Sequence, residues 1–66
     1  MAEEPSTNSL IPLEQRRAIF LALIEAQDGG ASVHQSRADM LHRYAVTEGQ
    51  VKAIEVEGME HEWPPL

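Results

Sequence analysis

A turn between two short helical segments, at residues 45–47, constrains the fold of this chain more than any other feature. Thr47 is followed three residues later by Gln50. This spacing is typical of a capping box, in which each of the two side chains hydrogen-bonds to the backbone of the other residue at a helix start. We therefore expect one helix to end near residue 44 and another to run over residues 48–57, where Gly58 favours its end.

The apolar residues on both sides of this turn recur at helical spacing. They are Met40, Leu41, Tyr44, Val46, Val51 and Ile54. Residues three and four positions apart share one side of a helix, so both helices can face one small core. Two helices joined by a tight turn in this way are typical of a helix-turn-helix.

A further helix is predicted before this pair, over residues 12–27. Pro12 suits the first turn of a helix, and the sequence Asp-Gly-Gly at residues 28–30 favours its end. The apolar residues of this segment form a wide stripe, which indicates that the helix has neighbours on more than one side. The residues are Leu13, Ile19, Phe20, Leu21, Leu23 and Ile24.

The middle helix is predicted over residues 33–44. Ser32 followed by Gln35 predicts a capping box at its start, and Ser36 followed by Asp39 is an alternative start one turn later. The side chains expected to face inward on this helix are those of Val33, Ser36 or Arg37, Met40, Leu41 and Tyr44.

Both ends of the chain lie outside the predicted helices. Residues 1–9 are polar and contain Pro5, so we expect a disordered arm, whereas Leu10 and Ile11 can fold back onto the core. Residues 59–66 end in Trp63-Pro64-Pro65-Leu66, and adjacent prolines favour an extended tail. The predicted fold class is all-α: a small three-helix helix-turn-helix domain over residues 10–66.

The charge of the chain is strongly acidic and evenly distributed. Five basic and eleven acidic residues give a net charge of −6, and residues 1–31 and 32–66 each carry −3. Phosphate contacts supply most of the non-specific affinity for nucleic acids, so this charge works against unaided binding to DNA.

Several classes of function are not expected from this composition. The chain has no cysteine, and the longest apolar run, at residues 18–24, is far shorter than the roughly 20 residues that span a bilayer. His34 and His42 lie two helical turns apart, too far to bind one metal ion. So small a domain has little room for a substrate pocket, and no set of catalytic groups is apparent. We expect a soluble cytoplasmic protein that is not an enzyme, binds no metal or cofactor, and does not contact a membrane.

Residues 44–58 resemble the helix-turn-helix of the fourth conserved region of primary sigma factors. The shared pattern is Val46-Thr47, three polar positions at 48–50, Val51, Lys52-Ala53 and Ile54-Glu55, and a less specific similarity extends back to Arg37. That region of sigma factors recognises the upstream promoter element, so the resemblance implies DNA binding in transcription or in another DNA-linked complex. Sigma factors carry arginine and other donors at positions 48–50, whereas this chain has Glu48 and Gly49.

Five residues are the candidates for contact with DNA in such a complex, with Gln50 placed to read adenine and Lys52 to read guanine or contact phosphate. The candidates are Arg37, Arg43, Thr47, Gln50 and Lys52. The alternative is a solvated helix surface with ordinary capping, where Glu55 can pair with Arg43 or Lys52. Helix-turn-helix motifs prefer Gly at the position of Ala45, and Ala is a mild change there if the turn avoids positive φ.

The tail suggests a second kind of function. Trp63, Pro64, Pro65 and Leu66 are candidates for binding a protein partner, because Trp is favoured in interfaces and extended proline segments lose little entropy on binding. The alternative is that Trp63 closes the core by packing over the first helix. The acidic charge favours an interaction module or accessory subunit that binds a polymerase, a nuclease or another nucleic-acid machine. The wide stripe on the first helix offers a homodimer interface.

Overall fold

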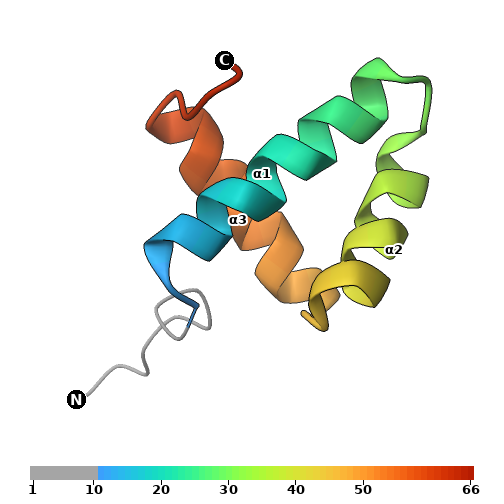
Figure 1. The fold of residues 1–66 in the computed structure, drawn as a ribbon, viewed down its shortest axis with the longest axis horizontal. Coiled ribbons are helices and arrows are strands. Elements are labelled where there is room, and N and C mark those ends of the chain that lie inside the picture. The colour runs from blue at the N-terminus through green and yellow to red at the C-terminus, as the bar shows by residue number, and fades with distance from the viewer. Residues whose placement is uncertain (1–10) are drawn as a thin grey trace.

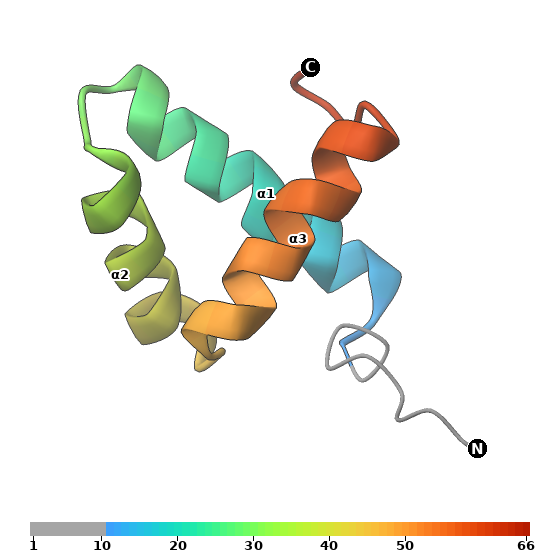
Figure 2. The same ribbon diagram turned by 180° about the vertical axis from the view of Figure 1, so that it is seen from behind.

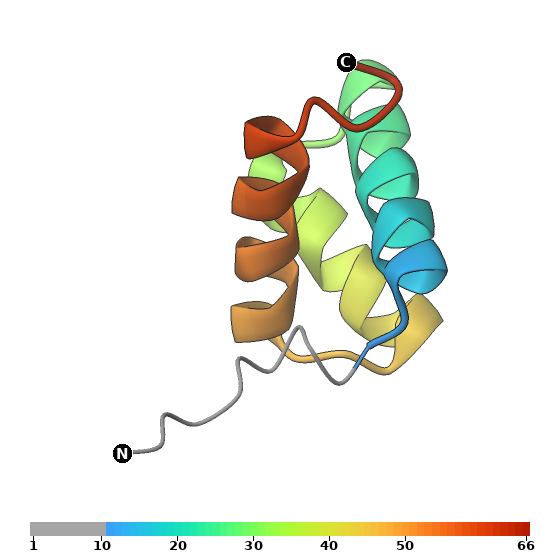
Figure 3. The ribbon, with the colours of Figure 1, turned by 90° about the vertical axis from the view of Figure 1, so that its left-hand side faces the viewer.

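The computed structural model describes residues 11–66, which form three helices joined by short connections. They are α1 (Leu13–Asp28), α2 (Val33–Tyr44) and α3 (Glu48–Glu60). Each helix contacts the other two. Figures 1 and 2 show α1 and α3 crossing, with α2 at one side of the crossing. Figure 3 shows α1 and α3 in two layers. This confirms the predicted all-α fold for the described residues, whereas the predicted disordered arm at residues 1–9, and Leu10, lie outside them.

The helix starts agree closely with the local sequence signals. Both predicted capping boxes are present, with Ser32 and Gln35 at the start of α2 and Thr47 and Gln50 at the start of α3. The start of α2 at Val33 excludes the alternative start one turn later. Pro12 is the N-cap of α1 rather than part of its first turn, so α1 is shifted by one residue from the predicted range.

The core lies where the three helices meet and includes one buried polar side chain. The buried apolar residues are Ile11, Ile19, Phe20, Leu23, Met40, Val51, Ile54 and Trp63. Ser36 is also buried, but its hydroxyl accepts a hydrogen bond from the Gln27 amide and donates one to the Val33 carbonyl. These partners compensate the hydroxyl for its loss of water. Ile11 is one of the buried residues, so it folds onto the core as expected.

Two apolar residues at helix starts lie outside the core, contrary to the predicted stripes. Val33 is 49% exposed, and Leu13 is also exposed. Each is the first residue of its helix, and the buried stripe of each helix begins later, at Ser36 in α2 and at Ile19 in α1.

The predicted end of the third helix is wrong, because α3 continues past Gly58 to Glu60. Gly58 is buried inside the helix, and a methyl group at its Cα would overlap the Phe20 ring of α1. Gly58 therefore allows a close approach of α3 to α1 rather than ending the helix.

The chain reverses direction after α3 and returns Trp63 to the core. Glu62 has a φ of 52°, the Glu62 N–H donates to the Met59 carbonyl and the Trp63 N–H donates to the Gly58 carbonyl. This is the hydrogen-bond pattern of a Schellman motif, which satisfies carbonyls at the helix end. Trp63 consequently meets Phe20 edge to face, with 6.0 Å between ring centroids.

Candidate functional site

The turn between α2 and α3 holds the two polar residues that were expected to reach a DNA groove. The Thr47 hydroxyl accepts from the Gln50 N–H at 3.1 Å, and the Gln50 side-chain oxygen accepts from the Thr47 N–H at 2.8 Å. Both side-chain oxygens are therefore engaged with the backbone at the start of α3.

Ala45 takes a left-handed conformation at this turn, with φ 55° and ψ 42°. Ala in place of Gly would be a mild change only if the turn avoided positive φ, and the turn does not avoid it. A left-handed conformation costs a residue with a Cβ about 1–2 kcal/mol, a cost that Gly avoids.

Arg37 forms the best-defined ion pair between α2 and α3. Its guanidinium donates two hydrogen bonds to the Glu55 carboxylate, at 2.7 and 2.9 Å. These hydrogen bonds raise the pKa of Arg37, because they stabilise its cationic form. The expected partners of Glu55 were Arg43 and Lys52. In the structure, Glu55 pairs with Arg37 instead. A two-pronged Arg–carboxylate pair fixes both groups in place and uses the Nε and Nη2 edge of the guanidinium, which is therefore not available to a phosphate.

The other two expected phosphate contacts are also next to carboxylates. Arg43 lies 3.3 Å from the Asp39 carboxylate on α2, and Lys52 lies 3.8 Å from the Glu48 carboxylate on α3. Both pairs are exposed and four residues apart, so each contributes only about 0.3–0.5 kcal/mol. Arg37, Arg43 and Lys52 are therefore each balanced by a neighbouring carboxylate, tightly at Arg37 and weakly at Arg43 and Lys52, and no unpaired cation links them across the surface of residues 11–66.

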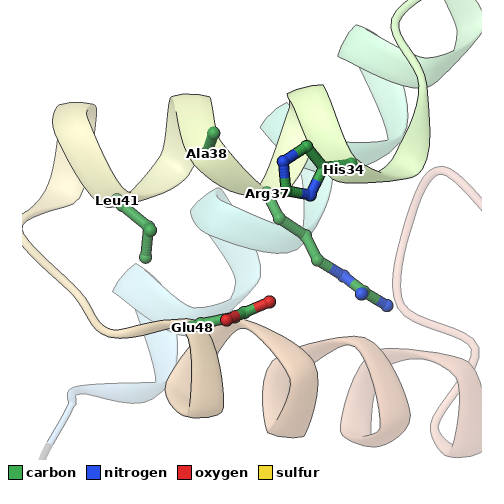
Figure 4. A pocket seen from close by; sticks show the side chains of 5 residues that line it. All are labelled: His34, Arg37, Ala38, Leu41 and Glu48. Atoms are coloured by element: carbon green, nitrogen blue, oxygen red, sulfur yellow. The ribbon is translucent and has the colours of Figure 1, made fainter.

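A small groove lies between α2 and α3, beside the Arg37 side chain. Its lining residues are His34, Arg37, Ala38, Leu41 and Glu48, and its volume is about 80 Å³. Figure 4 shows Leu41 and Arg37 pointing from α2 toward α3, with Glu48 at the start of α3. Sites for small molecules usually have volumes of about 300 Å³ or more, so this groove is too small to enclose a typical ligand.

The C-terminal residues separate into a buried and an exposed part. Trp63 is 5% exposed and packs on Phe20. Of the two alternatives for Trp63, closing the core therefore agrees with the structure. The Arg17 guanidinium lies 5.8 Å from the centre of the Trp63 ring. Pro64, Pro65 and Leu66 are exposed, and their contact with a partner stays a prediction.

The balance of charges was visible in the sequence, but the pairing was not. Besides the pairs of Arg37, Arg43 and Lys52 described above, Arg16 pairs with Glu57 at 3.1 Å and Arg17 lies over Trp63. Each basic residue therefore has a charged or aromatic neighbour. Five carboxylates within residues 11–66 have no such pairing: those of Glu14, Glu25, Asp28, Glu60 and Glu62. The free charge on the described surface is therefore negative.

An exposed apolar pair on α3 was not predicted from the sequence. Val56 and Met59 are 58% and 60% exposed. The signal was present in the spacing, because these two residues are out of phase with the buried Val51 and Ile54. Val56 lies within the predicted third helix but was not among the apolar residues assigned to the core, and Met59 was assigned to the tail.

Residues 11–66 contain no group of three His, Asp or Glu side chains placed to hold a metal ion. None of the three helices has the length and apolar character that crossing a membrane requires.

Comparison of the chain with protein-family models, with curated proteins and with solved structures gave no match.

Proposed function

We propose that this chain is a protein-interaction module, in which a helix-turn-helix scaffold presents an acidic surface to a basic surface of a partner protein. A polymerase or another nucleic-acid machine is a partner of suitable charge, because proteins that bind nucleic acids carry basic surfaces. The observation that carries the proposal is the neutralisation of Arg37, Arg43 and Lys52 by carboxylates.

The pairing disfavours phosphate as a ligand for two reasons. A phosphate that took the place of Glu55 on Arg37 would leave the released carboxylate beside another negative charge, and a phosphate on the remaining donors would lie close to that carboxylate. The net charge of −6 also repels a nucleic acid at long range, whereas it increases the association rate with a basic protein.

DNA binding is the second candidate function, and the geometry of the turn favours it. Three residues separate α2 from α3, and Thr47 and Lys52 are exposed near the start of α3, where DNA-reading helices carry their contacts. In this alternative, Arg37 and Arg43 bind phosphates, and Gln50 and Lys52 contact bases. The resemblance to sigma factors supports the same alternative.

Two titrations distinguish the candidates. Proteins captured from the source cell are identified by mass spectrometry, purified and titrated against the chain at low and moderate salt. We expect a basic partner whose affinity falls as salt increases, because added ions screen the attraction. In parallel, fluorescence anisotropy measures binding to random and promoter-like duplexes.

The matched control is Lys52→Ala, which removes a DNA contact but leaves the net charge acidic. Saturable binding of wild-type chain to duplex below about 100 μM, weakened by Lys52→Ala, would favour DNA binding and contradict the proposal. A basic protein that binds wild type and Lys52→Ala equally well, without binding of the chain to duplex, would support the proposal.

A further inference from the structure

The outer side of α3 carries two large apolar side chains that the fold leaves uncovered. Val56 and Met59 are three residues apart, so they are neighbours on the helix surface. They are 58% and 60% exposed, whereas Val51, Ile54 and Gly58 on the opposite side of the helix are buried. We call Val56 and Met59 the outer apolar pair.

The charged groups around the outer apolar pair are mainly carboxylates. Glu60 follows Val56 by four residues and therefore lies beside it, and Glu62 lies just beyond the end of α3. Neither has an ion-pair partner among residues 11–66. Lys52 precedes Val56 by four residues, but it lies 3.8 Å from the Glu48 carboxylate. The outer apolar pair therefore has a predominantly anionic border.

We propose that the outer apolar pair is the docking site for a basic amphipathic helix of another protein, with apolar anchors flanked by Lys or Arg. Such a helix would place its apolar side chains on Val56 and Met59 and its cations near Glu60 and Glu62. This inference rests on the proposed function and specifies which surface binds and which chemistry it selects.

Charge complementarity selects this occupant over the alternatives. A second copy of the chain, joined by two-fold symmetry through the same surface, would bring a second Glu60 and a second Glu62 to the interface and so add negative charge rather than balance it. DNA would bring phosphates to the same carboxylates. A basic helix supplies both the opposite charge and the apolar surface.

The direct test uses three synthetic peptides of about 15 residues, roughly four helical turns. The Leu/Arg peptide is designed as an amphipathic helix with Leu on one side and Arg on the other. The Leu/Glu peptide has Glu in place of Arg, and the third peptide has Ser in place of Leu. Each is titrated into the full chain by fluorescence anisotropy, and the methionine methyl groups are followed by NMR. We expect the Leu/Arg peptide to bind tightest. It should shift the Met59 methyl signal and leave that of the buried Met40 in place.

Two double variants locate the binding surface. Val56→Thr/Met59→Gln removes the outer apolar pair, and Leu13→Gln/Val33→Thr changes exposed apolar residues elsewhere. All substituted side chains are exposed, so both variants should fold, and circular dichroism is used to check this. We expect the first variant to weaken binding of the Leu/Arg peptide by at least about tenfold and the second to change it by less than about twofold.

Four results would overturn the inference. The Leu/Glu peptide could bind the chain as tightly as the Leu/Arg peptide, or the Val56→Thr/Met59→Gln variant could bind the Leu/Arg peptide as tightly as wild type does. The Leu/Arg peptide could fail to bind up to about 1 mM. Sedimentation could show that wild type forms a dimer and that Val56→Thr/Met59→Gln is the only variant that does not. Undiminished binding would move the site to another surface and leave the proposed function intact. The proposed function is tested separately by the duplex titration, and it fails if the chain binds duplex DNA in a way that Lys52→Ala weakens.

Discussion

Replacing Gly58 by Ala tests the close contact between α3 and α1. The added methyl group would overlap the ring of Phe20, which is fully buried between α1, α3 and Trp63. Overpacking of a core costs about 1–3 kcal/mol, and the upper value applies because a rigid buried ring has no space to move into. The better helix propensity of Ala offsets about 1 kcal/mol. We expect a net loss of about 2 kcal/mol.

The matched control is Gly49→Ala in the same helix. A Cβ at Gly49 would meet only the Thr47 hydroxyl oxygen, at an ordinary contact distance of 3.9 Å. Here the helix propensity acts alone, so the free energy of unfolding should rise by up to about 1 kcal/mol. The two substitutions are chemically identical and should act in opposite directions.

The assay is thermal and urea unfolding followed by far-UV circular dichroism. A net loss of about 2 kcal/mol should lower the melting temperature by about 8–16 °C in a domain of this size. In the double variant Phe20→Leu/Gly58→Ala, the cost of Gly58→Ala should shrink, because the ring that it meets is gone. If Gly58→Ala were as stable as Gly49→Ala, the packing of α3 on α1 would differ from that described.

Three further substitutions test individual features by urea unfolding. Ala45→Gly should stabilise the chain by about 0.5–1 kcal/mol, because Gly accepts the left-handed turn without strain; a loss of stability would mean that Ala45 is not left-handed. Arg37→Gln should lower the urea midpoint more than Arg43→Gln, because only Arg37 joins two helices through a two-pronged pair; equal effects would refute that difference. Trp63→Ala should cost about 3–5 kcal/mol and leave much of the chain unfolded; a cooperative transition near that of wild type would show that Trp63 is not part of the core.

Local sequence signals predicted the helix starts, whereas the end of α3 depended on distant packing. A capping box involves residues only three positions apart, so the starts at Ser32 and Thr47 could be read directly. Gly58 has the same local appearance as a helix end, but Phe20, 38 residues earlier in the chain, determines its role. The left-handed Glu62 has no glycine to mark it.

The candidate site was predictable in its overall charge but not in its pairing. Composition gives the net charge of −6, which favours a protein partner over DNA. Arg37 and Glu55 are 18 residues apart on different helices, so only the packing of α2 against α3 identifies them as a pair. Arg37 was therefore predicted to contact phosphate, although two of its donors are held by Glu55.

The measurement that tests the central claim most directly is the titration of fluorescent duplex DNA with the wild-type chain at low salt. Neutralisation of the candidate cations predicts no saturable binding up to about 100 μM, while the Leu/Arg peptide binds under the same conditions. Saturable binding of duplex that weakens steeply with added salt would contradict the claim, because it requires cations free to displace counterions from phosphate.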